Sequence, residues 1–138
     1  MSALNYRALP GALAGSANLS TGQYYAVRNS TGTVYGEVLE CTANTQRPIG
    51  IIQNDPASSG APAEVALDGI CRFQLGDTAT KGAILGIDAN GRGQIVAESS
   101  GTTGRYVFAE ALEAGSTGEV IWVRLFPAFK SFSGTSGT

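Results

Sequence analysis

Carboxylates are the side chains in this sequence best suited to acid and base catalysis, and a glycosidase needs two of them facing each other. Each aspartate considered for such a pair lies beside a turn residue: Asp55, Asp68, Asp77 and Asp88. Aspartate is common at turns because its carboxylate bonds the local backbone, and no spacing marks two of the four as a pair. Histidine is absent, which excludes the triads and metal sites that need imidazole. We therefore predict a protein that is not an enzyme, with no catalytic residue and no cofactor.

Two loops contain parts of known ion-binding or phosphate-binding motifs. Asp88-Ala-Asn-Gly91 resembles the start of a calcium loop, but the glycine comes too early and Arg92 takes a ligand position. Gly76-Asp-Thr-Ala-Thr-Lys-Gly82 has the ingredients of a phosphate loop in the wrong order. We therefore predict a hairpin turn at the first, a surface loop at the second, and no metal site.

Aromatic side chains that stack on sugars are a further possibility. The candidates are spread along the sequence: Tyr24, Tyr25, Tyr35 and Trp122. Because aromatic residues are also routine in β-strands, they do not by themselves indicate a ligand. A carbohydrate-binding β module remains an alternative function.

Composition and cysteine content limit the partners and the compartment. The chain has 138 residues, a net charge of −2 and 14% charged residues, so one domain with no basic surface for nucleic acid is expected. No stretch is long and apolar enough to span a membrane, and Pro10 and Gly11 interrupt any signal sequence. We expect Cys41 and Cys71 to be buried free thiols, with a single bridge between them as the alternative.

Apolar residues alternate with polar ones over much of the chain, which is typical of half-buried β-strands. The clearest example is residues 64–75, where one face carries Val65, Leu67, Cys71, Phe73 and Leu75. Gly69 interrupts this pattern and indicates a bulge or the close approach of another segment.

Turn signals predict two hairpins. The first joins residues 23–28 to 33–39, and the second joins residues 83–88 to 94–98 through an Asn-Gly turn. Residues 106–114 alternate between flanking glycines, so we expect a strand there in spite of their good helix propensity. The predicted fold class is all-β, a small compact domain of short strands and hairpins.

The last strand-like segment, residues 119–126, is apolar on both faces apart from Glu119 and Arg124, and Pro127 is expected to end it. Such a strand is typical of a core or a subunit contact. One face carries Val120, Trp122 and Phe126, and the other carries Ile121, Val123 and Leu125. We predict a homo-oligomer with Val120, Trp122 and Phe126 in its interface. The alternative is a two-sheet core that buries both faces within one chain.

The two ends of the chain differ from its middle. Residues 1–22 are predicted to be an extended N-terminal arm, residues 23–129 the β domain, and residues 130–138 a flexible C-terminal tail. The arm carries apolar anchors separated by small and polar residues: Leu4, Tyr6, Leu9, Leu13 and Leu19. We expect it to be poorly ordered in the free protein and to bind a partner, although a first strand of the domain itself is the alternative.

Four segments in order resemble the capsid decoration or cement proteins of tailed-phage heads. They are Gly22-Gln-Tyr-Tyr-Ala-Val27, then Arg47-Pro-Ile-Gly-Ile-Ile-Gln-Asn-Asp-Pro56, then Gly82-Ala-Ile-Leu85 with Asp88-Ala-Asn-Gly-Arg92, and finally Ala109-Glu-Ala-Leu-Glu-Ala114 with Gly118-Glu-Val-Ile-Trp-Val123. Each segment taken alone has only the residue types that strands and turns commonly have. The resemblance therefore depends on the order and spacing of the four segments, and it covers roughly residues 20–127.

The resemblance implies a β-tulip fold assembled as a homotrimer on a capsid of the HK97 type. It implies a virion protein, made in the host cytoplasm, that binds the outer surface of the mature head and stabilises contacts between major capsid protein subunits. The resemblance does not fix which residues touch the shell. From the spaced apolar residues of the arm we expect Leu4, Tyr6, Leu9 and Leu13 to contact the capsid, and from the composition we expect neither nucleic acid nor membrane as a partner. A tail or baseplate structural domain is a further alternative.

Overall fold

Ten β-strands join in one sheet, and no α-helix occurs in the part of the chain that the computed structural model describes, residues 5–15, 19, 22–96 and 105–130. The all-β prediction is therefore confirmed. The strands are β1 Tyr6–Ala8, β2 Leu13–Ala14, β3 Ala26–Asn29, β4 Glu37–Glu40, β5 Gly50–Ile52, β6 Val65–Gln74, β7 Ile84–Ile87, β8 Gly93–Ile95, β9 Tyr106–Ala111 and β10 Val120–Lys130.

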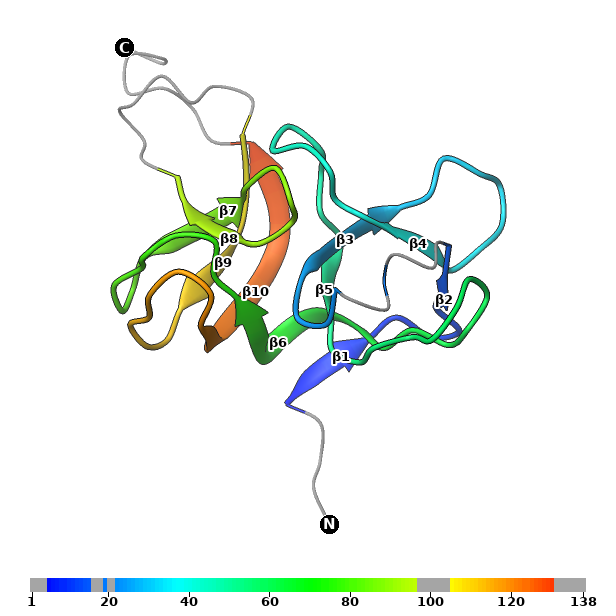
Figure 1. The fold of residues 1–138 in the computed structure, drawn as a ribbon, viewed down its shortest axis with the longest axis horizontal. Helices are drawn as coiled ribbons and strands as arrows, with labels where there is room; N and C mark the ends of the chain where they lie inside the picture. Colours follow the sequence, from blue (N-terminus) through cyan, green and yellow to red (C-terminus); the bar gives the residue numbers. More distant parts are fainter. Residues whose placement is uncertain (1–4, 16–18, 20–21, 97–104, 131–138) are drawn as a thin grey trace.

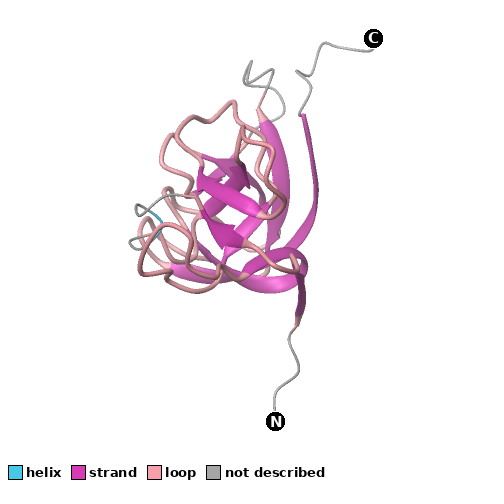
Figure 2. Ribbon diagram, turned by 90° about the vertical axis from the view of Figure 1, so that its right-hand side faces the viewer, coloured by secondary structure: helices cyan, strands magenta, loops and turns pink. Residues whose placement is uncertain are grey.

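The strand order is β2-β4-β3-β5-β6-β10-β9-β7-β8, with β1 paired to β6 outside this path. Strand β6 joins the two halves, because its first residues pair with β5 and β1 and its later residues pair with β10. Figure 1 shows β2–β5 on one side of β6 and β7–β9 on the other. In the side view the strands lie toward one side of the molecule and most loops toward the other (Figure 2).

Gly69 lies where β6 changes partner and where β1 approaches it most closely. Its φ is +96°, and a Cβ atom there would lie 2.5 Å from the carbonyl oxygen of Asn5. The register shifts beside this point, since Arg7 pairs with Asp68 whereas Ala8 pairs with Ala66. The close approach predicted at Gly69 is confirmed.

The core has two clusters of buried side chains, and β6 contributes to both. Cys71, Phe73 and Leu75 belong to the larger cluster, where Phe73 meets Phe108 edge to face with 5.5 Å between ring centroids. Val65 belongs to the smaller cluster. The prediction that these apolar residues share one face is therefore wrong: those before Gly69 pack in the smaller cluster and those after it in the larger one, with the change beside the register shift against β1.

Both predicted hairpins are confirmed. Strand β3 pairs with β4 and β7 pairs with β8, each pair antiparallel. Residues 106–111 form β9, so the prediction of a strand in place of a helix is also confirmed.

The prediction that Pro127 ends the last strand is wrong. Strand β10 continues to Lys130, and its register against β9 shifts between Leu125 and Phe129. Proline is tolerated at such an irregularity because no ladder hydrogen bond is required from its nitrogen. Lys130, expected to begin the tail, is the last residue of β10; the rest of the expected tail lies outside the described residues.

The described part of the N-terminal segment is built into the domain, which differs from the poorly ordered arm that we expected. Strand β1 pairs with β6, and β2 pairs in parallel with β4. Ala12, Ala14 and Leu19 are buried in the smaller core cluster. Burial of these side chains and the backbone pairing outweigh the weak local propensity of the sequence.

None of the described residues belongs to a helix with the length and hydrophobicity of a membrane span.

Candidate functional site

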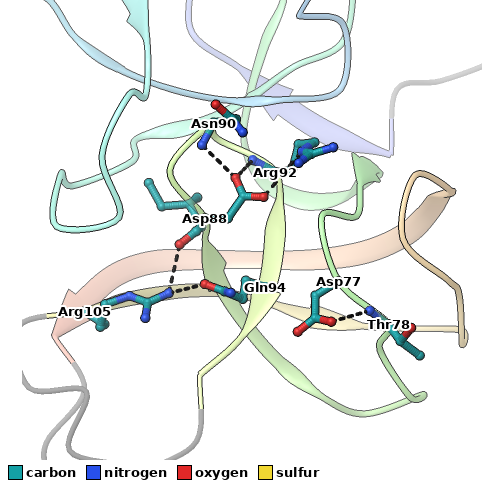
Figure 3. Close-up of polar contacts among 8 residues, drawn as sticks. Asp77, Thr78, Asp88, Asn90, Arg92, Gln94 and Arg105 are labelled. Carbon is teal, nitrogen blue, oxygen red and sulfur yellow. Dashed lines mark hydrogen bonds and ion pairs between the residues drawn. The ribbon is translucent and has the colours of Figure 1, made fainter.

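Three of the four aspartates weighed above as catalytic or metal-binding groups make structural contacts. The Asp88 carboxylate accepts hydrogen bonds from the backbone of Asn90 (2.8 Å) and Arg92 (3.0 Å), and it pairs with the Arg92 side chain at 3.3 Å (Figure 3). Asp77 caps the backbone of Thr78 (Figure 3), and Asp68 pairs with Arg7 at 2.5 Å. No group of three or more metal-ligating residues forms among the described residues. Asp88 therefore closes a hairpin turn, as predicted.

Arg105 fastens the start of β9 to the same hairpin. Its guanidinium donates to the carbonyl oxygen of Ile87 at 3.0 Å and to the side chain of Gln94 at 2.5 Å (Figure 3). This contact ties the start of β9 to β7 and β8.

One face of strands β6, β7, β9 and β10 is the candidate interaction surface. One row of cross-strand partners runs over four neighbouring strands: Ile84 on β7, Glu110 on β9, Arg124 on β10 and Ile70 on β6. Two residues along, Trp122 on β10 is the partner of Arg72 on β6. Residues directly opposite each other lie on the same face of a sheet. We call these six residues the Trp122 face: Ile70, Arg72, Ile84, Glu110, Trp122 and Arg124.

The Trp122 face combines large exposed apolar side chains with charges. Ile70 and Ile84 are each 40% exposed and Trp122 is 41% exposed. The Arg124 guanidinium bonds the Glu110 carboxylate at 2.5 Å, so these two charges neutralise each other. Exposed apolar residues gathered on one face are typical of protein–protein contacts.

Buried and more exposed side chains alternate along strand β10 from Val120 to Phe126. Ile121, Val123 and Leu125 are buried in the larger cluster, whereas Trp122 is exposed and Val120 and Phe126 are half-buried. As expected, Val120, Trp122 and Phe126 lie on one face of this strand, and Ile121, Val123 and Leu125 lie on the other. Only one of the two faces is buried within the chain, so the alternative of a core on both sides does not apply to the described structure.

Arg72 belongs to this surface, and sequence reasoning did not single it out as a site residue. Its guanidinium lies over the Trp122 ring, 4.9 Å from the centroid, and over the Tyr24 ring at 5.7 Å. Cations are attracted to the faces of aromatic rings at such distances. The Arg72 Nε atom is buried and has no hydrogen-bond partner among the residues that the structure describes.

The backbone around this stack is held by specific bonds. The Gln53 side chain donates to the Arg72 carbonyl at 2.9 Å and accepts from the Arg72 amide at 3.2 Å, as a neighbouring strand would. Tyr24 has a φ of 70°, and its backbone bonds both Ile52 and Gln74. A strained residue held by its surroundings is typical of a position with a defined role.

A second surface feature lies beside the loop between β3 and β4. It is a groove of about 490 Å³ that we call the Tyr35 groove, lined by Leu9, Asn29, Ser30, Gly32, Thr33, Val34, Tyr35, Gly36 and Glu37. Val34 is 63% exposed and Tyr35 is 67% exposed. The Tyr35 hydroxyl donates to the Pro10 carbonyl at 2.7 Å, which fixes one wall of the groove.

Three of the four aromatic residues considered as a sugar platform are divided between these two surfaces. Tyr24 and Trp122 meet at Arg72, whereas Tyr35 lines the groove beside the loop between β3 and β4. No single stacking platform combines them.

The residues predicted to bind a capsid differ in how far their side chains are exposed. Leu4 lies outside the described residues. Tyr6 packs against the larger core cluster and Leu9 against the smaller one, and Leu13 is 37% exposed. Of the three described residues, Leu13 is the one whose side chain is most available.

Cys41 and Cys71 are free and buried, as predicted. Burial raises the pKa of each thiol to about 12. Neither thiol is therefore a nucleophile at neutral pH, because the reactive form is the thiolate.

Comparison with known proteins identifies the fold but no family. No protein-family model and no curated protein matches the chain. Among solved structures, the chain resembles the head fiber gp8.5 N base of bacteriophage phi29, with a TM-score of 0.63 and 17% sequence identity. The match covers 83% of this chain and 90% of that chain. At this identity the two chains share a fold.

Proposed function

We propose that this chain is a structural protein of a tailed-phage virion that binds the outer surface of the head. The observation that carries the proposal is the shared fold with a phage head fiber base, which extends over 83% of this chain. The four segments that resemble phage decoration proteins support the same conclusion independently of that fold comparison.

The proposed role is that of a cement. A protein that binds the assembled shell, and not its dissociated subunits, stabilises the shell by mass action. Its partner is the major capsid protein, of the HK97-like type. The protein is non-enzymatic, and it assembles as a homotrimer of β-tulip-like domains, so that several copies engage the shell together and add avidity.

Surface chemistry supports a protein-binding role. Trp, Tyr and Arg are the residue types that contribute most to protein–protein binding energy, and Trp122, Tyr24 and Arg72 form one stack. We assign this stack to the contact between copies, together with Val120 and Phe126. The capsid contact is assigned to the N-terminal segment that includes Leu4, Tyr6, Leu9 and Leu13; Tyr6 and Leu9 hold the segment on the core and Leu13 is exposed for binding.

Binding to purified heads tests the proposal. Tail-free heads of the encoding phage, stripped of this protein, are incubated with the purified chain and sedimented. We expect saturable binding and an increase in the temperature at which the heads release their DNA. A Leu13→Asp variant should bind heads less tightly than the wild type. Ile95→Asp, at a similarly exposed side chain, is the matched control and should bind as the wild type does. If heads neither bind the chain nor gain stability from it, the proposed role is wrong, and binding to isolated tails would favour a tail or baseplate domain.

A further inference from the structure

We infer that two copies of this chain bind each other head to tail, with Arg72 of one copy paired to Glu37 of the next. The contact joins the Trp122 face to the Tyr35 groove. This inference rests on the proposed self-association and names the residues that form it.

The donor side is a preorganised cation. Two aromatic rings flank the Arg72 guanidinium, and no acceptor among the described residues bonds it. Ile70 and Trp122 beside it are exposed. An arginine that lies over two aromatic rings and is bonded by no acceptor among the described residues fits a carboxylate, because its planar fork matches the two carboxylate oxygens.

The acceptor side has the opposite charge and is hollowed into a groove. Glu37 lines the Tyr35 groove, and its carboxylate accepts no hydrogen bond from the described residues. The exposed Val34 and Tyr35 lie in the same wall. The groove, about 490 Å³ in volume, is large enough to receive an aromatic side chain such as Trp122.

The two surfaces lie on different halves of the sheet. The Trp122 face is built on β6, β7, β9 and β10, and the Tyr35 groove lies by the loop between β3 and β4, at the other end of the long axis from β7 and β9 (Figure 1). A contact between two different patches is heterologous, and it closes into a ring when the rotation between copies allows. A closed ring is consistent with the homotrimer proposed above.

Charge reversal tests the pair directly. The oligomeric state is measured by sedimentation velocity over a range of protein concentrations, for Arg72→Glu, Glu37→Arg and the double variant. Each single reversal should weaken self-association at least about tenfold, since removing one partner of a desolvated charge pair leaves the other unpaired. The double variant should recover most of that loss. Lys81→Glu and Asp55→Arg, at exposed charges outside both surfaces, should leave self-association unchanged.

Circular dichroism melting of every variant separates loss of contact from loss of folding. Where a single reversal does not fold, Arg72→Gln or Glu37→Gln takes its place as the single variant, and recovery is judged on the double charge reversal alone. A monomeric wild-type protein at all concentrations overturns the inference. So does self-association that withstands both reversals, or a double variant no better than the single ones. Head binding is measured with the same variants. If the wild type does not bind heads, the proposed virion role is wrong; if it binds heads but the reversals do not change self-association, only the Arg72–Glu37 contact is wrong.

Discussion

Gly69 and Tyr6 touch backbone to backbone: a Cβ atom on Gly69 would lie 2.7 Å from the Cα atom of Tyr6. This contact fixes β1 against β6 at the point where β6 passes from one half of the sheet to the other. Two residues that lie 63 positions apart in the sequence therefore determine whether the N-terminal segment belongs to the domain.

Gly69→Ala should destabilise the fold more than Gly60→Ala does. Both glycines have a positive φ, but a Cβ atom on Gly60 would have nothing within 4 Å. The left-handed backbone alone costs about 1–2 kcal/mol for alanine, and the clash at Gly69 adds about 1–3 kcal/mol. Urea unfolding of the two variants measures the difference, and equal losses would contradict the close approach of β1.

Leu19→Ala should cost about 2–5 kcal/mol of unfolding free energy, as for other buried leucines, because Leu19 is fully buried in the smaller core cluster. Leu13→Ala is the matched control in the same segment, with a side chain that is 37% exposed. It should cost less than about 1 kcal/mol. A free arm would make both substitutions neutral, so a neutral Leu19→Ala would show that the segment does not pack on the core.

Thiol titration should return two cysteines per chain after denaturation without reductant, and almost none in the native protein. Both thiols are free and buried, and burial raises the pKa of each to about 12. Protonated, inaccessible thiols react slowly with a disulfide reagent. Recovery of no thiol after denaturation would indicate a bridge.

Alkaline pH should weaken the fold through these same thiols. The pKa of each cysteine rises from 9.0 to about 12 in the folded protein, so the folded chain holds protons that the unfolded chain releases. The contribution of the protonated thiols to the free energy of unfolding is complete below pH 9.0, and it is lost as the pH rises toward 12. Unfolding free energies measured from neutral to alkaline pH should fall more steeply for the wild type than for the Cys41→Ala/Cys71→Ala double variant. Parallel curves would show that the thiols are not the cause.

Local patterns in the sequence were sufficient to predict much of the fold. The alternation around Phe73 indicated β6, and the Asn90-Gly91 pair indicated the second hairpin. Each signal lies within a few neighbouring residues, where strand period and turn chemistry act directly.

Features set by distant partners were missed. Strands β1 and β2 have three and two residues, too short for a periodic signal, and they exist through pairing with β6 and β4. Pro127 fits within β10 because of the register shift against β9. The Arg72 stack depends on the register that places Trp122 opposite Arg72, and that register is a property of the folded sheet.

The most direct test of the virion role is quantitative mass spectrometry of purified particles, with heads and tails separated before digestion. The account predicts that the chain is found in the head fraction, in a fixed ratio to the major capsid protein, and that protease treatment of intact heads removes it while the shell remains. Detection only in tails, or absence from both fractions, would contradict the account.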